Sequence, residues 1–168
     1  GYGGYKKQNG ILNKLIRFDT FHVAMQYFSY ALIGQAYMGV GRNLAYKKSL
    51  FFDNKGFSSH LQIPSGDDDL FIRDIADSKN VTITLDKSAH TLSDPETTFF
   101  DWINQKKRHL TTGVYYHFLH KILLFLYSFS QMFFLVIGAY LLLKGWMFIE
   151  VLSIVLARLL FQLIIYYK

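Results

Sequence analysis

Large apolar side chains recur every three or four residues from Phe18 to Tyr37, and this spacing predicts a helix. A short helix is predicted over residues 49–54 and a longer one over Leu70–Lys79. Between Val81 and Leu85, β-branched residues alternate with others, as expected of a strand. Helices and a strand in this order indicate part of an α/β domain.

A further helix is predicted to begin near Asp94-Pro95-Glu96, because a cap residue, a proline in the first turn and an acid just inside favour a helix start. It carries aromatic residues and then a basic run over residues 106–108. An aromatic helix with a basic end is typical of a membrane interface, and the aromatic segment 18–37 suits the same place. For segment 18–37, an ordinary amphipathic helix on a soluble core is an equal alternative.

Two stretches late in the chain are long and apolar enough to cross a membrane. Residues 122–143 are 22 residues without a charge, and as a helix they extend roughly 33 Å. Lys144-Gly145 predicts a tight turn, after which residues 146–167 form a second apolar stretch. Within that stretch Arg158 lies deep, where a charged side chain is expected to face protein, water or a lipid phosphate.

These spans divide the chain into a partial domain, residues 1–120, and a transmembrane hairpin, residues 121–168. Basic residues shortly before the first span place the preceding domain on the cytoplasmic side of the cell (inner or plasma) membrane. They are Lys106, Lys107, Arg108 and Lys121. We therefore expect a multi-pass membrane protein whose partners include membrane lipids.

The composition agrees with a membrane protein, since 51% of the 168 residues are hydrophobic and 18% are aromatic. The net charge of +6 suits nucleic acid, anionic lipid or a phosphate-bearing substrate, and the two spans argue against nucleic acid. Disulfides, thiolate metal sites and cysteine nucleophiles are excluded because the sequence has no cysteine. The sequence begins Gly-Tyr-Gly-Gly-Tyr without a methionine, and we expect it to be a piece of a longer protein.

Three consecutive carboxylates, Asp67-Asp68-Asp69, follow a turn at Pro64-Ser65-Gly66. Like charges side by side repel each other, so this run calls for an explanation. One is capping, because carboxylates at a helix N-terminus accept unpaired N–H groups and oppose the helix dipole. The other is a site at which a carboxylate acts as a base or meets a cation. The run alone favours capping, and the motifs after it favour a site.

Upstream of the acids, the loop Gly39-Val40-Gly41-Arg42-Asn43 combines two glycines with a positive charge. Glycines allow a close approach of the backbone, so such a loop is able to bind phosphate, but the spacing is not that of a full nucleotide-binding fingerprint. A turn between a strand and a basic helix is the alternative interpretation.

In their order along the chain, these motifs resemble those of the membrane-bound glycosyltransferases of family 2, which include cellulose, chitin and hyaluronan synthases. That family has a Rossmann-like GT-A domain with an acidic motif, Thr-Glu-Asp or Gly-Asp-Asp, then Gln-x-x-Arg-Trp on an interfacial helix, then transmembrane helices. Here Gly66-Asp67-Asp68 matches the acidic motif, and residues 105–109, Gln-Lys-Lys-Arg-His, match the second motif. The 39–43 loop resembles the acceptor-side loop of the family. The resemblance implies the C-terminal portion of a GT-A domain with interfacial amphipathic helices, followed by a transmembrane hairpin.

The resemblance also implies roles for individual residues. Asp68 would be the base that takes the proton of the acceptor hydroxyl, and Asp67 would hold its geometry or strengthen it by like-charge repulsion. Arg108 would stabilise the leaving diphosphate, and Gln105 would orient phosphate or sugar. The remaining substrate-binding residues would be His109, Gly41 and Asn43.

Two features depart from the family pattern. His109 stands where the family has a tryptophan that helps to form the acceptor-sugar site, so the acceptor and processivity are open. No Asp-x-Asp metal motif and no nucleotide-binding strand and helix precede the acidic turn, so the donor half is expected upstream. A divalent metal, Mg or Mn, is expected through that upstream motif, with no metal site in this chain, which by itself is expected to be inactive.

The expected function is transfer of a sugar, with inversion, from a nucleotide-sugar donor to a saccharide or lipid-linked acceptor at the cytoplasmic membrane face. The alternative is a non-enzymatic membrane transporter or assembly subunit, in which the three aspartates cap a helix. An Asp-x-Asp motif upstream would favour the enzyme, and another run of spans would favour the transporter.

Overall fold

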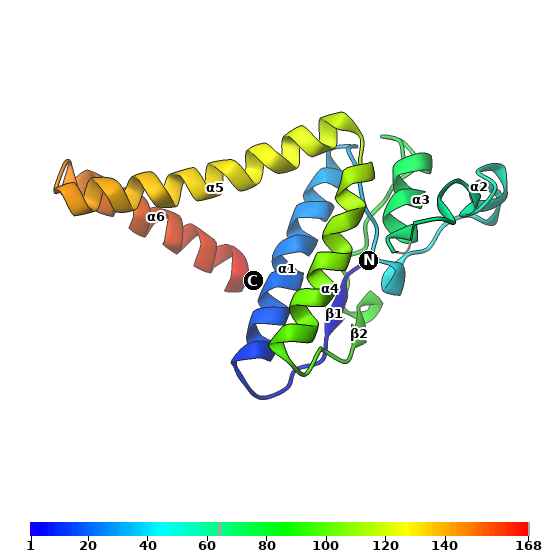
Figure 1. Cartoon of the computed structure of the whole chain (residues 1–168), viewed down its shortest axis with the longest axis horizontal. Helices are drawn as coiled ribbons and strands as arrows, with labels where there is room; N and C mark the ends of the chain where they lie inside the picture. The colour runs from blue at the N-terminus through cyan, green and yellow to red at the C-terminus, as the bar shows by residue number, and fades with distance from the viewer. Residues whose placement is uncertain (64, 168) are drawn as a thin grey trace. The chain divides into compact units, whose positions relative to one another are not determined.

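The computed structural model describes residues 1–63 and 65–167 of the chain. Pro64, the first residue of the predicted acidic turn, and Lys168 lie outside the described residues. The chain divides into two compact units, Gly1–Lys121 (unit 1) and Ile122–Lys168 (unit 2). The colours of Figure 1 give the order of the helices and strands along the chain.

Unit 1 is built from short strands, α-helices and single turns of 3-10 helix. The helix predicted over residues 49–54 is confirmed as α2, shifted by one residue. In chain order the elements are β1 (Gly3–Tyr5), α1 (Ile11–Leu32), η1 (Gly41–Asn43), α2 (Lys48–Asp53), η2 (Ser58–His60), α3 (Asp67–Ile75), η3 (Lys87–Ala89), β2 (Thr91–Ser93), α4 (Phe99–Thr112), η4 (Gly113–Tyr115) and the first turn of α5 (Phe118–Lys144).

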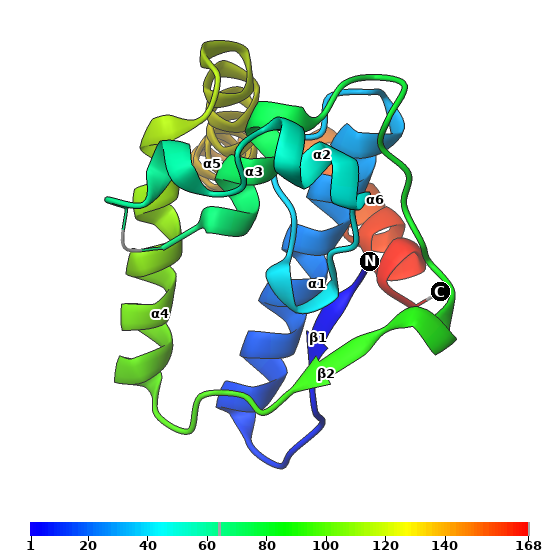
Figure 2. The same ribbon diagram turned by 90° about the vertical axis from the view of Figure 1, so that its right-hand side faces the viewer.

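The sheet of unit 1 consists of β1 and β2, which run parallel with Gly3 opposite Thr91 and Tyr5 opposite Ser93. Figure 2 shows this strand pair on one side of α1 and α4 on the other. The strand predicted over Val81–Leu85 is wrong, because that segment is irregular and β1 takes residues 91–93 as its partner instead. Alternating β-branched residues make a strand only where a neighbouring backbone is free to pair. The α/β prediction therefore holds for a small parallel sheet within a chain that is mostly helical.

Helix α1 begins earlier than the predicted segment 18–37 and buries a different face. It also ends earlier, at Leu32, and of its predicted apolar residues Phe18 and Leu32 are exposed, 54% and 69%, whereas three others, Phe21, Met25 and Phe28, are half-buried. Helix α1 packs against β1, whose two glycines present no side chains to it. The buried side chains are Asn13, Ile16, Ala24 and Tyr27.

Helix α3 carries the centre of the unit 1 core. It begins at Asp67 and ends at Ile75, and is therefore displaced from the predicted range Leu70–Lys79. Leu70 and Phe71 are fully buried, and burial of such side chains contributes roughly 1.5–3 kcal/mol each. The Phe71 ring lies 4.6, 5.8 and 5.7 Å from the ring centroids of Tyr46, Phe51 and Phe57. This packing fixes the position of the acidic first turn of α3.

Helix α4 begins at Phe99 and not near Asp94, as had been predicted. Its cap is Thr98, whose hydroxyl oxygen accepts the Asp101 N–H at 3.1 Å, while the hydroxyl donates to the Asp101 carboxylate at 2.5 Å. This reciprocal pair of hydrogen bonds satisfies an N–H group at the start of α4. Pro95 has no side-chain acceptor for such a group, and it lies buried in the connection from β2.

Unit 2 consists of the rest of α5 and of α6 (Phe148–Tyr167). By length and composition, Phe118–Lys144 and Phe148–Tyr166 are able to cross a membrane, and most of their large apolar side chains are exposed, unlike those of a core helix. The predicted turn is confirmed, since α5 ends at Lys144 and Gly145 adopts a left-handed φ of 68°. Of the three surroundings expected for Arg158, the structure shows protein, because Arg158 donates a hydrogen bond to Gln131 and lies 4.2 Å from the ring centroid of Phe134.

Candidate functional site

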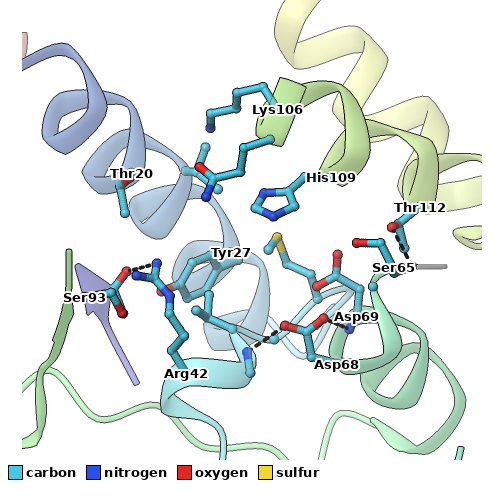
Figure 3. Close-up of a pocket in the computed structure, with 18 of the residues that line it drawn as sticks. Thr20, Tyr27, Arg42, Ser65, Asp68, Asp69, Ser93, Lys106, His109 and Thr112 are labelled. Carbon is cyan, nitrogen blue, oxygen red and sulfur yellow. Dashed lines mark hydrogen bonds between the residues drawn. The ribbon is translucent and has the colours of Figure 1, made fainter. Parts of the chain in front are cut away.

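The acidic turn opens onto a pocket of about 480 Å³ in unit 1. Its walls come from β1, α1, the loop of residues 38–42, the start of α3 and one face of α4. Figure 3 shows Asp68 and Asp69 on one side of this pocket, with His109 of α4 pointing toward them from the other. Segments that are far apart in the sequence therefore meet at the three carboxylates.

Gly66 fixes the acidic turn against α4. It has a φ of 85°, a left-handed conformation that favours glycine, and it is the residue that precedes the first turn of α3. A Cβ atom on Gly66 would lie 2.2 Å from the Thr112 hydroxyl oxygen, so no side chain fits there. The Thr112 hydroxyl donates to the Ser65 carbonyl at 3.3 Å. The start of α3 thus rests directly on the end of α4.

Asp68 is held by backbone donors. Its carboxylate accepts the Gly41 N–H at 2.6 Å and, through the other oxygen, the Asp69 N–H at 3.1 Å. The glycines of the 39–43 loop let it lie close to α3, because a Cβ on Gly41 would lie 3.1 Å from the Asp68 carboxylate and one on Gly39 would lie 2.9 Å from Ile72. The loop therefore binds a carboxylate of its own chain, which argues against its interpretation as a phosphate-binding loop.

Asp69 is buried, with 8% of its surface exposed, yet it also lines the pocket. Its carboxylate accepts the Tyr116 hydroxyl at 2.7 Å and the Gly39 N–H. Burial, and then the charge of Asp68, raise the pKa of Asp69 to about 7, while the hydrogen bonds from Tyr116 and Gly39 oppose the shift. The N-cap residue is Gly66, which has no side chain, and the three acids occupy the first turn of α3, where they oppose the helix dipole and Asp68 accepts one first-turn N–H.

One face of α4 forms the opposite wall of the pocket. Its residues recur at the three- and four-residue spacing of a helix face, and they are Trp102, Gln105, Lys106, His109 and Thr112. Gln105 donates to the Glu96 carboxylate at 3.2 Å and accepts the Tyr5 hydroxyl at 3.3 Å, so its amide is oriented. Partial shielding from water, followed by the charges of Lys106 and Arg108, lowers the pKa of His109. At neutral pH its imidazole is therefore uncharged and able both to donate and to accept a hydrogen bond.

Two cations on the pocket wall already have partners in the chain. Arg42 donates to the carbonyls of Gly3 and Gly4 at 2.8 and 3.1 Å, and its guanidinium lies 4.4 Å from the centroid of the Tyr5 ring. Lys106 forms an ion pair with Asp19 of α1. These contacts tie the walls together and leave hydroxyl, amide, imidazole and carboxylate groups as the main polar surface of the pocket.

The pocket brings together five of the seven residues predicted for the site, and two lie elsewhere. Asp67, Asp68, Gln105, His109 and Gly41 line it. Arg108 is exposed and is not part of the lining, and Asn43 is used structurally. The Asn43 amide donates to the carbonyls of Tyr2 at 2.9 Å and Ala89 at 2.6 Å, which join the start of β1 to the segment before β2.

Replacement of Asn43 by alanine is therefore expected to destabilise unit 1 by roughly 1–3 kcal/mol, because two part-buried carbonyls lose their donor. Substrate affinity should be unchanged. Thermal unfolding of the detergent-solubilised chain measures the first effect, with Asn104→Ala on the exposed side of α4 as the control. A variant of normal stability with weakened substrate binding would restore the predicted binding role of Asn43.

Sequence reasoning missed Tyr116 and Thr112, and it noted Asp69 in the acidic run and Arg42 in the glycine loop without giving either a role in the site. All four act through three contacts across more than 35 residues, namely Asp69 with Tyr116, Arg42 with Gly3 and Thr112 with Ser65. Local spacing does not reveal such pairs. The third aspartate of the run was the one available signal, because a single base explains only part of it.

Among residues 1–63 and 65–167, no group of three or more histidine, aspartate or glutamate side chains is arranged to hold a metal ion. The divalent metal was expected through an upstream Asp-x-Asp motif, and that expectation stays a prediction. No protein-family model matches the chain, and neither does any curated protein or solved structure. Function is therefore inferred from the residues of the pocket.

Proposed function

We propose that this chain belongs to a membrane glycosyltransferase of the GT-A type, and that its pocket receives the acceptor of the sugar. The observation that carries the proposal is the meeting of the acidic turn with the polar face of α4 in one pocket. The order of the acidic turn, the Gln105–His109 segment and the apolar helices, which resembles that of the family 2 enzymes, supports it. The donor is a nucleotide sugar, and the acceptor is a saccharide or a lipid-linked saccharide.

In this proposal Asp68 is the general base. Its carboxylate reaches the pocket and is oriented by two backbone N–H groups, so it needs no rearrangement to meet an acceptor hydroxyl. The hydroxyl proton passes to Asp68 while the acceptor oxygen forms its bond to the anomeric carbon. The bond from that carbon to the diphosphate breaks on the opposite side, which inverts the configuration and releases the nucleoside diphosphate.

The wall formed by α4 supplies the groups that recognise a sugar. The Gln105 amide and the neutral imidazole of His109 are matched to hydroxyl groups, because each offers both donors and acceptors. Trp102 and Tyr5 add aromatic surface, on which the apolar face of a sugar ring packs. Arg108 lies outside the lining and remains proposed for the diphosphate of the donor.

The proposal is tested by incubating the full-length protein, in membranes or nanodiscs, with a panel of nucleotide sugars. We expect release of a nucleoside diphosphate from at least one donor, together with a sugar added to a saccharide or lipid. The matched control is Asp68→Asn, which should bind the same donor without turnover. A wild-type protein that releases nothing from the whole panel would overturn the proposal.

We further propose that α5 and α6 cross the membrane as an antiparallel hairpin, with unit 1 in the cytoplasm and residues 145–147 outside. The basic residues before the first span support this orientation. Since the sequence has no cysteine, Trp146→Cys creates a single thiol at an exposed position of the turn. It should react with an impermeant maleimide on intact cells, whereas Ser88→Cys in unit 1 should react only after permeabilisation. The reverse pattern would contradict the orientation.

A further inference from the structure

A second carboxyl group, that of Asp69, lies beside the proposed base, and the mechanism above gives it no task. It lines the pocket but is buried, and it accepts hydrogen bonds from two different segments of the chain. The hydroxyl of Tyr116, in the segment that joins η4 to α5, donates to it at 2.7 Å. The Gly39 N–H donates to it from the loop whose next glycine, Gly41, donates to Asp68. Neighbouring glycines of one loop thus hold neighbouring carboxylates of one helix turn.

We propose that Asp69 is a positioning residue for sugar transfer, whose buried carboxyl group, held by Tyr116 and Gly39, sets the place and the basicity of Asp68. This inference rests on the proposed function of the pocket. The contact geometry supports the first part, because Asp68 accepts the N–H of Asp69 itself at 3.1 Å, so any shift of Asp69 moves a donor of the base.

The electrostatic surroundings of Asp69 support the second part. The titratable groups that face it are Asp67 and Asp68 on α3, Tyr37 ahead of η1, and Tyr116 after η4. Burial raises the pKa of both tyrosines, so they are neutral. The ring of Tyr37 lies 5.4 Å from that of Tyr116 and 5.9 Å from that of His120 on α5, which closes the cluster from the other side. Its charged members are therefore all acidic.

This arrangement predicts a dependence of the rate on pH. Since the pKa of Asp69 is raised to about 7, its carboxyl group is neutral below that pH and charged above it. A charged Asp69 repels the charge of Asp68 and makes Asp68 a stronger base. The acceptor proton still passes to Asp68 alone, and Asp69 has the same charge before and after the step. His109 titrates below its ordinary range, so its proton is lost at a lower pH.

The experiment is a profile of kcat/KM for transfer between pH 6 and pH 8.5 with the full-length protein, using the donor found active in the panel. For the wild type we expect a rise of about three- to tenfold across pH 7. Asp69→Asn should remove the rise and stay near the low-pH rate throughout. Tyr116→Phe removes a hydrogen bond that favours the charged form of Asp69, so the rise should move to higher pH. Tyr115→Phe, whose exposed side chain has no contact with Asp69, is the matched control.

A merely structural role for Asp69 predicts a loss of rate that is equal at all pH values. An active wild type whose rise persists unchanged in Asp69→Asn would overturn the inference and leave the proposed function intact. If Asp69→Asn does not fold, Tyr116→Phe decides, and a rise at the wild-type pH overturns the inference. A wild type without any transfer overturns the proposed function first, and the role of Asp69 with it.

Discussion

Replacement of Asp68 by asparagine is expected to lower the rate of sugar transfer by a factor on the order of a hundred to ten thousand. Asparagine has the same size, and its single side-chain oxygen keeps one of the two hydrogen bonds, the one from the Gly41 N–H or the one from the Asp69 N–H, so thermal unfolding of the variant is measured beside its turnover. Asparagine cannot take a proton at neutral pH, and the acceptor hydroxyl then has no base. Turnover is measured as nucleoside diphosphate released per unit time, and donor binding by calorimetry should be unchanged.

The control for Asp68 is Asp94→Asn, because Asp94 also lines the pocket. Its carboxylate is 73% exposed and pairs with Lys6 at 3.0 Å, an arrangement typical of a surface ion pair worth about 1 kcal/mol or less. That variant should keep near-normal turnover. If the three aspartates only oppose the helix dipole, Asp68→Asn should be as active as Asp94→Asn, with a stability change of about 1 kcal/mol or less. A fully active Asp68→Asn would end the claim that Asp68 is the base.

Replacement of Gly66 by alanine is expected to destabilise unit 1 by about 2–5 kcal/mol. A left-handed conformation costs a residue with a Cβ atom roughly 1–2 kcal/mol, and overpacking against Thr112 adds roughly 1–3 kcal/mol. The midpoint of thermal unfolding should fall by on the order of ten degrees. The sequence has two tryptophans, so in a Trp146→Phe background the fluorescence of Trp102 reports on unit 1 alone.

A double-mutant cycle separates the two causes. Thr112→Ala removes Oγ1 and Cγ2, 2.2 and 2.4 Å from a Cβ on Gly66, but keeps the Thr112 Cβ at 2.8 Å, so it should relieve most of the overpacking of Gly66→Ala and none of its conformational strain. Combined, the two changes should be less destabilising than the sum of the single effects. Strictly additive effects would mean that Gly66 and Thr112 do not press on each other, and the account of how the acidic turn is anchored would then fail.

Local patterns in the sequence predicted the helices better than the sheet. The apolar spacing of α1 and the long uncharged stretch of α5 are properties of single segments, and both helices are present. The strand was misplaced because Val81–Leu85 has the right alternation but no partner, whereas Thr91–Ser93 has little pattern and pairs with β1. Pairing over such a distance is decided by packing that no local window contains.

The site was predictable to the extent that its chemistry lies in short motifs. Asp68, Gln105 and His109 were named from the two motifs, and they share a pocket. Asn43 and Arg108 were named by the same reasoning, but neither lines it, because position in a motif does not say toward which side a side chain points. The hydrogen bond from Tyr116 to Asp69 joins residues 47 positions apart, and no short sequence pattern predicts it.

The contact between Gly66 and Thr112 also bears on the order in which the protein matures. At typical rates of synthesis, Thr112 is added roughly two to nine seconds after Gly66. During that interval the acidic turn lacks its contact with Thr112, and the apolar face of α3 remains accessible to chaperones. Thr112 and Tyr116 are the last parts of the site to be made, and the first apolar helix, Phe118–Lys144, follows at once. If α5 enters a membrane as proposed, completion of the pocket and delivery of the nascent chain to that membrane fall in the same short period of biogenesis.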